Sequence, residues 1–192
     1  MANNENKNED SINLDILLIG KLSVGKSSMI CRFLDVPLEE KETGPHRGPD
    51  VTVISVDGVK CIIKIREINP DDCDNLLESA KGTMLIYEID DKDSFEDIKK
   101  CYNNKIKKLN NKACILVGNK LDLESERKVT KNEAEEFANE NELSFLEISA
   151  KDNVNVKEAF MRIVHETLQK RQELLSNKNS NFLEKCCKCI LV

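Results

Sequence analysis

The segment from Gly20 to Ser27 has the residue types and the spacing that bind phosphate. It reads GKLSVGKS, which fits the pattern G-x-x-x-x-G-K-[ST], and it lies between an apolar run and a segment with helical spacing. Its glycines allow the backbone N–H groups and the next helix N-terminus to point at phosphate oxygens. A glycine turn capped by serine is the alternative, but the flanking strand and helix favour a phosphate loop. The expected contacts are Gly20, Ser23, Val24, Gly25, Lys26, Ser27 and Ser28.

Two side chains of this loop carry further chemistry. Lys26 is expected to reach the outer phosphates of a nucleotide, and the Ser27 hydroxyl is expected to coordinate Mg²⁺. A phosphate loop does not by itself distinguish ATP from GTP, so the base must be recognised elsewhere.

Two later segments are candidates for binding the base. Asn119-Lys120-Leu121-Asp122 follows the apolar run 114–117, and Ser149-Ala150-Lys151 follows the run 145–148. Both therefore lie at the carboxyl ends of predicted strands, where ligands bind in parallel sheets. Either segment alone could be an ordinary polar loop, but their order and spacing together favour a base-binding site. The expected base-binding residues are Asn119, Lys120, Asp122, Ser149, Ala150 and Lys151.

With these segments in place, the sequence resembles the small GTPases of the Ras-like superfamily, and the Rab branch within it. The resemblance covers residues 12–172. It also rests on shorter matches to the Rab branch, namely Arg32-Phe33, Asp93-Ser94-Phe95, Glu136-Phe137-Ala138 and Phe145-Leu146-Glu147.

The resemblance implies GTP or GDP with Mg²⁺ as cofactors. In this family the aspartate of N-K-x-D accepts hydrogen bonds from guanine, so Asp122 is the expected specificity residue. Adenine offers neither of those donors, and a buried carboxylate left unpaired against it costs about 1–3 kcal/mol or more. By the same resemblance, Asn119 bridges to the phosphate loop, Lys120 packs along the base, and the Ala150 N–H meets guanine O6.

The sequence departs from the family pattern at the end of the third predicted strand. Where the family has D-x-x-G-Q, this chain has Glu67-Ile68-Asn69-Pro70-Asp71. Glu67 keeps a carboxylate near the metal, but Pro70 has no N–H to offer the γ-phosphate. Asp71 replaces the glutamine that orients water, and its negative charge repels the γ-phosphate. We therefore expect slow GTP hydrolysis and weak discrimination between GTP and GDP, with no catalytic residue assigned.

The loop before the second predicted strand is also altered. The family's metal-binding threonine falls near Pro45, and Thr43 could substitute only if the loop shifts. The aromatic residue that usually lies against guanine falls at Leu38, so that stacking is lost. His46 and Arg47 are interpreted as solvated loop residues rather than a replacement catalytic pair.

The last residues carry a lipidation pattern. Cys189-Ile190-Leu191-Val192 matches C-a-a-X, which predicts a prenylated Cys189. Cys187 or Cys186 could carry a second lipid, and two lipids anchor a protein stably where one does not. A zinc site is the alternative, but no nearby ligand completes it.

Apolar periodicity predicts one α/β domain. Asp57-Gly58 joins two strands as a hairpin, and elsewhere strands and helices alternate, so we expect a P-loop NTPase fold: a doubly wound, mostly parallel six-stranded sheet with one antiparallel edge strand. A helix after Pro70 is expected to be disturbed. The expected strands are 12–19, 51–56, 61–65, 84–89, 113–117 and 143–148, and the expected helices 26–34, 93–109, 130–139 and 156–174. The expected units are a disordered tail 1–11, a G domain 12–175 and a flexible tail 176–192.

Composition sets further bounds. The net charge of −6 argues against general nucleic-acid binding. The polar N-terminus lacks the apolar core of a signal peptide, and we expect the protein to stay in the cytosol. Cys31, Cys61, Cys73, Cys101 and Cys114 are interpreted as small core residues in a reducing compartment.

The leading hypothesis is a Rab-like GTPase that regulates membrane traffic from the cytosolic face of an internal membrane. Its partners would be exchange factors, an escort or dissociation inhibitor, and effectors. The rival hypothesis is an adaptor whose nucleotide is structural, which the altered D-x-x-G-Q segment favours. A P-loop kinase is a third and weaker hypothesis, because the segments predicted to bind guanine would have no role in it.

Overall fold

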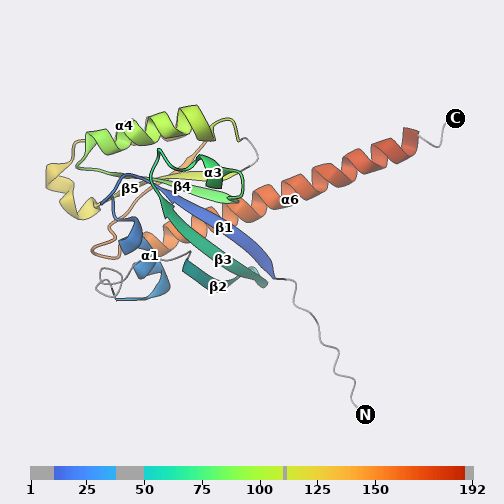
Figure 1. The fold of residues 1–192 in the computed structure, drawn as a ribbon, viewed down its shortest axis with the longest axis horizontal. Coiled ribbons are helices and arrows are strands. Elements are labelled where there is room, and N and C mark those ends of the chain that lie inside the picture. Colours follow the sequence, from blue (N-terminus) through green and yellow to red (C-terminus); the bar gives the residue numbers. More distant parts are fainter. Residues whose placement is uncertain (1–10, 38–49, 110–111, 189–192) are drawn as a thin grey trace, which may run out of the picture.

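The computed structural model describes residues 11–37, 50–109 and 112–188, with side chains as far as Ser176 (Figure 1). Strands and helices alternate along the chain, as the apolar periodicity predicts. The strands are β1 (Ile12–Ile19), β2 (Asp50–Val56), β3 (Val59–Ile68), β4 (Gly82–Glu88), β5 (Ala113–Asn119) and β6 (Ser144–Glu147). The helices are α1 (Lys26–Leu34), α3 (Asp74–Leu77), α4 (Lys92–Cys101), α5 (Lys131–Glu140) and α6 (Val156–Lys188), with a π-helical turn (Tyr102–Ile106) and a 3₁₀ segment (Leu121–Glu126).

The six strands form one sheet in the order β2-β3-β1-β4-β5-β6. Every neighbouring pair is parallel except β2 with β3, which is antiparallel. Asp57 and Gly58 join that pair, and both have positive φ angles, 51° and 78°, which a tight hairpin turn of this kind requires. The predicted fold class is therefore confirmed, including the antiparallel edge strand.

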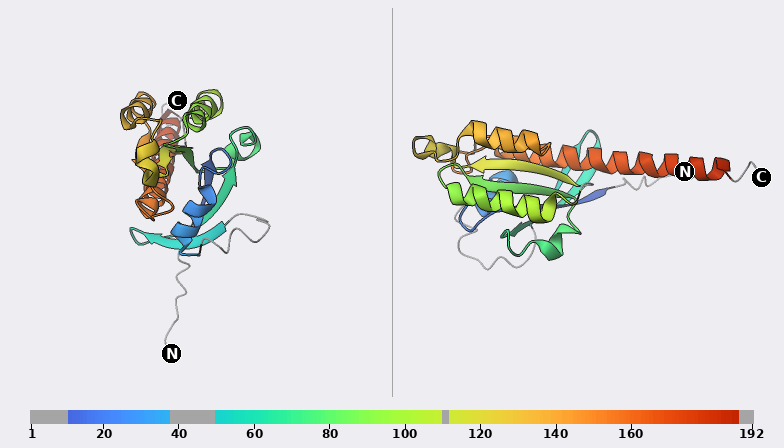
Figure 2. Two further views of the ribbon diagram at one scale, coloured as in Figure 1. Left: turned by 90° about the vertical axis from the view of Figure 1, so that its left-hand side faces the viewer. Right: turned by 90° about the horizontal axis from the view of Figure 1, so that it is seen from above.

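Helices cover both faces of the sheet (Figure 2). Alternate residues of β1 point to opposite faces, as the two-residue period of a strand requires. Ile16 and Leu18 pack with α1 and α6 on one face, whereas Leu17 and Ile19 pack with α3, α4 and α5 on the other. The central strands β1, β4 and β5 are thus largely buried on both faces, which leaves their carboxyl ends as the place where a ligand can bind.

Two helices differ from the sequence expectation, whereas a third agrees with it. The helix after Pro70 is a single turn, α3, as the expected disturbance implies. In place of the predicted helix 93–109, the α-helix ends at Cys101 and is followed by a π-helical turn. The last helix continues to Lys188, past its expected end at Leu174, because residues 157–188 contain neither glycine nor proline to stop it. The segment expected to be a flexible tail therefore starts as a helix.

Several expectations fall outside the described residues. They concern most of the N-terminal tail, the altered loop with Leu38, Thr43, Pro45, His46 and Arg47, and the C-a-a-X motif with Cys189. Cys186 and Cys187 belong to the helical backbone of α6, but their side chains are not described. Within the described residues, no helix combines the length and the apolar character needed to cross a membrane.

The cysteines of the domain body are reduced thiols that pack into the interior. Cys31, Cys61, Cys73 and Cys101 are buried and Cys114 is half-buried, which confirms their interpretation as core residues. Burial raises the pKa of the Cys73 thiol, and it raises that of Cys101 to about 12.

We predict that these thiols react slowly with Ellman's reagent in the folded protein. A pKa near 12 instead of 9.0 lowers the thiolate fraction of Cys101 on the order of 1,000-fold at neutral pH. The measurement uses a variant with serine at Cys186, Cys187 and Cys189, so that only body thiols report. Rapid modification before unfolding would contradict the prediction, and denaturant should release all the thiols at once.

Candidate functional site

The phosphate loop connects the end of β1 to the start of α1, as its motif requires. A side chain at Gly20 would place a Cβ 2.6 Å from the Ile86 carbonyl oxygen, and one at Gly25 would lie 2.3 Å from Asn119 Nδ2. Gly25 also has a φ of 91°, which side-chain-bearing residues rarely adopt. Both glycines are therefore needed for the close turn that brings backbone N–H groups toward a phosphate.

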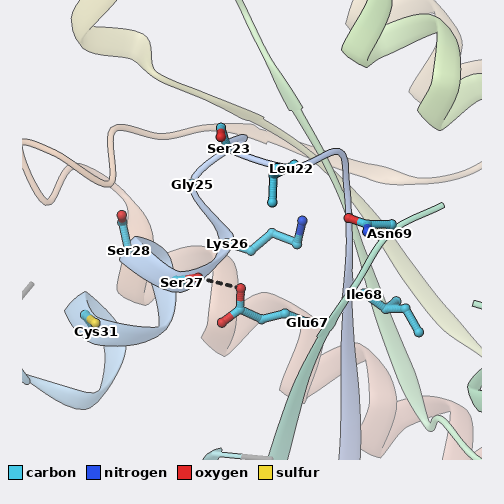
Figure 3. A pocket seen from close by; sticks show the side chains of 10 residues that line it. All are labelled: Leu22, Ser23, Gly25, Lys26, Ser27, Ser28, Cys31, Glu67, Ile68 and Asn69. Atoms are coloured by element: carbon cyan, nitrogen blue, oxygen red, sulfur yellow. Dashed lines mark hydrogen bonds between the residues drawn. The ribbon is translucent and has the colours of Figure 1, made fainter. Parts of the chain in front are cut away.

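A pocket of about 500 Å³ opens beside this loop (Figure 3). Lys26, Ser27 and Ser28 of α1 line it on one side, and Glu67 and Asn69 from the end of β3 line the other. The loop residues Leu22, Ser23 and Gly25 also border it, although 83% of the surface of Leu22 is exposed. The pocket lies at the carboxyl ends of the parallel strands, as the sequence predicts.

Lys26 is held against the loop that it follows. Its Nζ donates hydrogen bonds to the carbonyl oxygens of Gly20 and Lys21, each at 2.6 Å. Burial lowers the pKa of Lys26, and the negative charge of Glu67 opposes this effect. A buried ammonium group held by backbone carbonyls is a good binding group for phosphate oxygens, because they offer it a charged acceptor.

Ser27 and Glu67 bring two oxygen ligands together. The Ser27 hydroxyl donates to Glu67 Oε2 at 2.7 Å, so the hydroxyl of α1 and the carboxylate of β3 meet at the pocket wall (Figure 3). Oxygen ligands suit Mg²⁺, which usually keeps several waters and takes its other ligands from substrate phosphates. The donor set therefore fits Mg²⁺, with Ser27 and Glu67 as the residues that would hold it.

Asn119, at the end of β5, joins the phosphate loop to the predicted base loop. Its Nδ2 donates to the Val24 carbonyl oxygen at 2.8 Å, and its Oδ1 accepts from the Ala150 N–H at 3.0 Å. The side chain is only 1% exposed. The bridge inferred from family resemblance is thus present. The Ala150 N–H is engaged with Asn119 here, and its contact with guanine O6 stays a prediction.

Asp122 lies beside Ser149 and Lys151, so the two predicted base-binding segments meet. Its Oδ1 accepts from the Ser149 hydroxyl at 2.7 Å, and Lys151 Nζ is 3.6 Å from its Oδ2. Burial acts to raise the pKa of Asp122, but the hydrogen bonds and Lys151 outweigh it and the pKa lies below its ordinary 3.8. The carboxylate is therefore ionised at neutral pH and ready to accept hydrogen bonds from a ligand.

Lys120 and Arg32 support the segments predicted to bind the nucleotide base. Lys120 forms an ion pair with the mostly buried Glu88, and its φ of 66° turns the chain sharply after β5. Arg32 of α1 donates to the carbonyl oxygens of Ala150 and Lys151, at 2.9 and 2.6 Å. The sequence indicated Arg32 only through a family match. These hydrogen bonds could not be inferred from the sequence, because the partners of Arg32 lie 118 and 119 residues away along the chain.

The altered segment borders the phosphate pocket as far as Asn69, and the residue that follows is tied to other elements. The Pro70 carbonyl oxygen accepts from Lys105 Nζ and from the Cys73 thiol, each at 3.1 Å. Lys105 also pairs with Asp74 at 2.9 Å. The segment is thus tied to α3 and to the turn that follows α4, and Pro70 offers no N–H toward the pocket.

The arrangement can bind a phosphate chain at one end and a hydrogen-bonding base at the other, with Asn119 between them. Residues 15–169 match the sequence profile of the Ras family. The chain is 36% identical to the human Ras-related protein Rab-12 over 88% of its own length and 73% of that protein. It is 31% identical to the Ras-like protein rasS of Dictyostelium discoideum, over 90% and 91% of the two chains. The chain therefore belongs to the Ras family of small GTPases and is related to its Rab branch.

Proposed function

We propose that this protein binds GTP and GDP with Mg²⁺ and acts as a regulator of intracellular membrane traffic that hydrolyses GTP slowly. The observation that carries nucleotide binding is the Asn119 bridge, which fixes the phosphate loop relative to the Ala150 segment. In the bound state Lys26 would contact the outer phosphates, Ser27 and Glu67 would hold the metal ion, and Asp122 would accept from guanine. Bound Mg²⁺ would offset the negative charge of the phosphates.

Slow hydrolysis is proposed from the segment after β3. Pro70 cannot donate a backbone hydrogen bond to the γ-phosphate, and the Asp71 carboxylate is a poor group for orienting an attacking water. The contacts of the Pro70 carbonyl with Lys105 and Cys73 would also resist rearrangement when the γ-phosphate is present or lost. The same features support weak discrimination between GTP and GDP.

The altered segment after β3 also supports a second candidate function. A chain that binds nucleotide but does not respond to the γ-phosphate would serve as an adaptor with a structural nucleotide. The two candidates differ in whether effectors bind the GTP and GDP forms differently, so a pull-down with each loaded form separates them.

Membrane attachment is proposed through lipid on Cys189, with Cys187 or Cys186 as a second site. The C-a-a-X match at the end of the chain supports it. The proposed location is the cytosolic face of intracellular membranes, with a cytosolic pool bound to an escort or dissociation inhibitor. Exchange factors and effectors are the other proposed partners.

The test of slow hydrolysis is single-turnover GTP cleavage by the purified protein with Mg²⁺. We expect the wild type to keep its GTP for hours, and the double variant Pro70→Gly, Asp71→Gln to cleave it roughly ten-fold faster or more, because it regains a backbone donor and a water-orienting amide. Asp72→Asn is the matched control, because it changes a neighbouring charge but neither motif position. Hydrolysis by the wild type as fast as by the double variant would overturn the proposal.

A further inference from the structure

A second pocket, of about 350 Å³, lies at the amino ends of the strands, opposite to the end that carries the phosphate loop. One wall is a face of α6 that includes Lys170, Arg171 and Leu174, and the other is formed at the starts of strands, by Leu14 of β1 and by Lys81 and Lys112, which precede β4 and β5. The volume lies in the range of small-molecule pockets. Nothing in the proposed nucleotide site uses these residues.

The charge of this pocket is unusual for an acidic protein. Four cationic side chains line it, namely Lys81, Lys112, Lys170 and Arg171, and none of its described lining residues is a carboxylate, although the chain carries a net charge of −6. Among the side chains that the structure describes, Lys81, Lys170 and Arg171 have no ion-pair partner.

Lys112 shows that the positive charges are crowded. Its Nζ donates to the carbonyl oxygens of Leu77 and Glu78, which fixes it at the pocket wall. Burial lowers the pKa of Lys112, the neighbouring Lys81 lowers it further, and Glu78 offsets part of the effect. An anion in the pocket would relieve this repulsion.

The rest of the lining is largely apolar. Leu14 and Ala80 form a buried floor, while Leu174 and Leu175 remain 39% and 49% exposed on α6. A free inorganic anion would make no use of these side chains. A ligand with an anionic head and an aliphatic chain satisfies both parts of the lining.

We propose that this pocket binds an acidic phospholipid of a membrane, with the phosphate among the four cations and the start of an acyl chain against Leu174 and Leu175. Its position supports this occupant, because α6 extends away from the body on this side of the molecule (Figure 1). The site is independent of the nucleotide and of the C-terminal cysteines, and it adds a direct lipid contact on the domain itself.

The experiment is vesicle co-sedimentation of the full chain, produced without lipid and loaded with GDP. Vesicles of phosphatidylcholine alone are compared with vesicles that also contain phosphatidic acid. We expect binding to the acidic vesicles, and a roughly ten-fold or greater loss of it in the variant Lys170→Glu, Arg171→Glu. The matched control is Lys128→Glu, Lys157→Glu, which makes the same change of net charge at exposed lysines outside the pocket and should bind as the wild type does.

Two further measurements distinguish lipid binding in the pocket from general attraction of the protein to a negatively charged surface. Leu174→Asn keeps all four cations and should still lower binding several-fold, and soluble short-chain phosphatidic acid should compete where glycerol phosphate does not. The proposal is overturned if the wild type does not bind acidic vesicles, if both charge variants lose binding equally, or if Leu174→Asn binds undiminished. Because no arm depends on hydrolysis or prenylation, these results are separable from the proposed function.

Discussion

Replacing Lys26 by alanine is expected to give a protein that purifies without bound nucleotide. The substitution removes a buried ammonium group that would make charge-assisted hydrogen bonds to two phosphates, each contributing about 1.5–3 kcal/mol. We therefore expect the affinity for GDP to fall on the order of 100-fold or more. The measurement is nucleotide content by chromatography of the denatured protein, followed by titration with labelled GDP.

Lys21→Ala provides the comparison for this variant. Lys21 belongs to the same loop, but its side chain pairs with Asp97 at 3.0 Å instead of entering the phosphate pocket. Its loss should leave nucleotide content nearly unchanged. Lys26→Ala that retains stoichiometric GDP, with an unchanged circular dichroism spectrum, would show that the phosphates bind elsewhere.

The second large effect is expected in the recognition of the nucleotide base. Asp122→Ala should bring the affinities for GTP and ATP close together, because the carboxylate that accepts from guanine is gone. The affinity for GTP should fall on the order of 100-fold, since two hydrogen bonds to a charged group are lost. Competition of unlabelled GTP and ATP against a fluorescent guanine nucleotide measures both changes.

Ser149→Ala distinguishes base recognition from loop support in this experiment. It removes the hydrogen bond that orients Asp122, at 2.7 Å, but it leaves the carboxylate in place. We expect it to weaken binding while the preference for GTP persists. If Asp122→Ala keeps a strong preference for GTP, another group reads the base.

The sequence predicted those parts of the molecule that depend on neighbouring residues. The phosphate loop, the Asp57-Gly58 hairpin and the span of β1 follow from local glycine chemistry and from runs of apolar residues. The Asn119 bridge could be expected only through family resemblance, because its partner Val24 is 95 residues away.

Other features required the folded chain. The ties of Lys105 to the Pro70 carbonyl and of Arg32 to the base loop depend on how helices pack on the sheet. The cationic pocket combines the starts of three strands with α6, and no motif in the sequence indicates such a combination.

The length of α6 also determines how the domain would be oriented on a bilayer. From Leu175, beside the lipid pocket, to Lys188, next to the terminal cysteines, a helix rises about 20 Å at 1.5 Å per residue. Two attachment points at the ends of such a rod would hold it along the bilayer surface, instead of letting the domain swing from a single anchor. Because α6 begins just after the predicted base-binding segment 149–151 and runs past the strand starts, the line joining the two ends of the domain would then lie parallel to the bilayer. The nucleotide site would lie to one side of the lipid contact, where soluble partners can reach it.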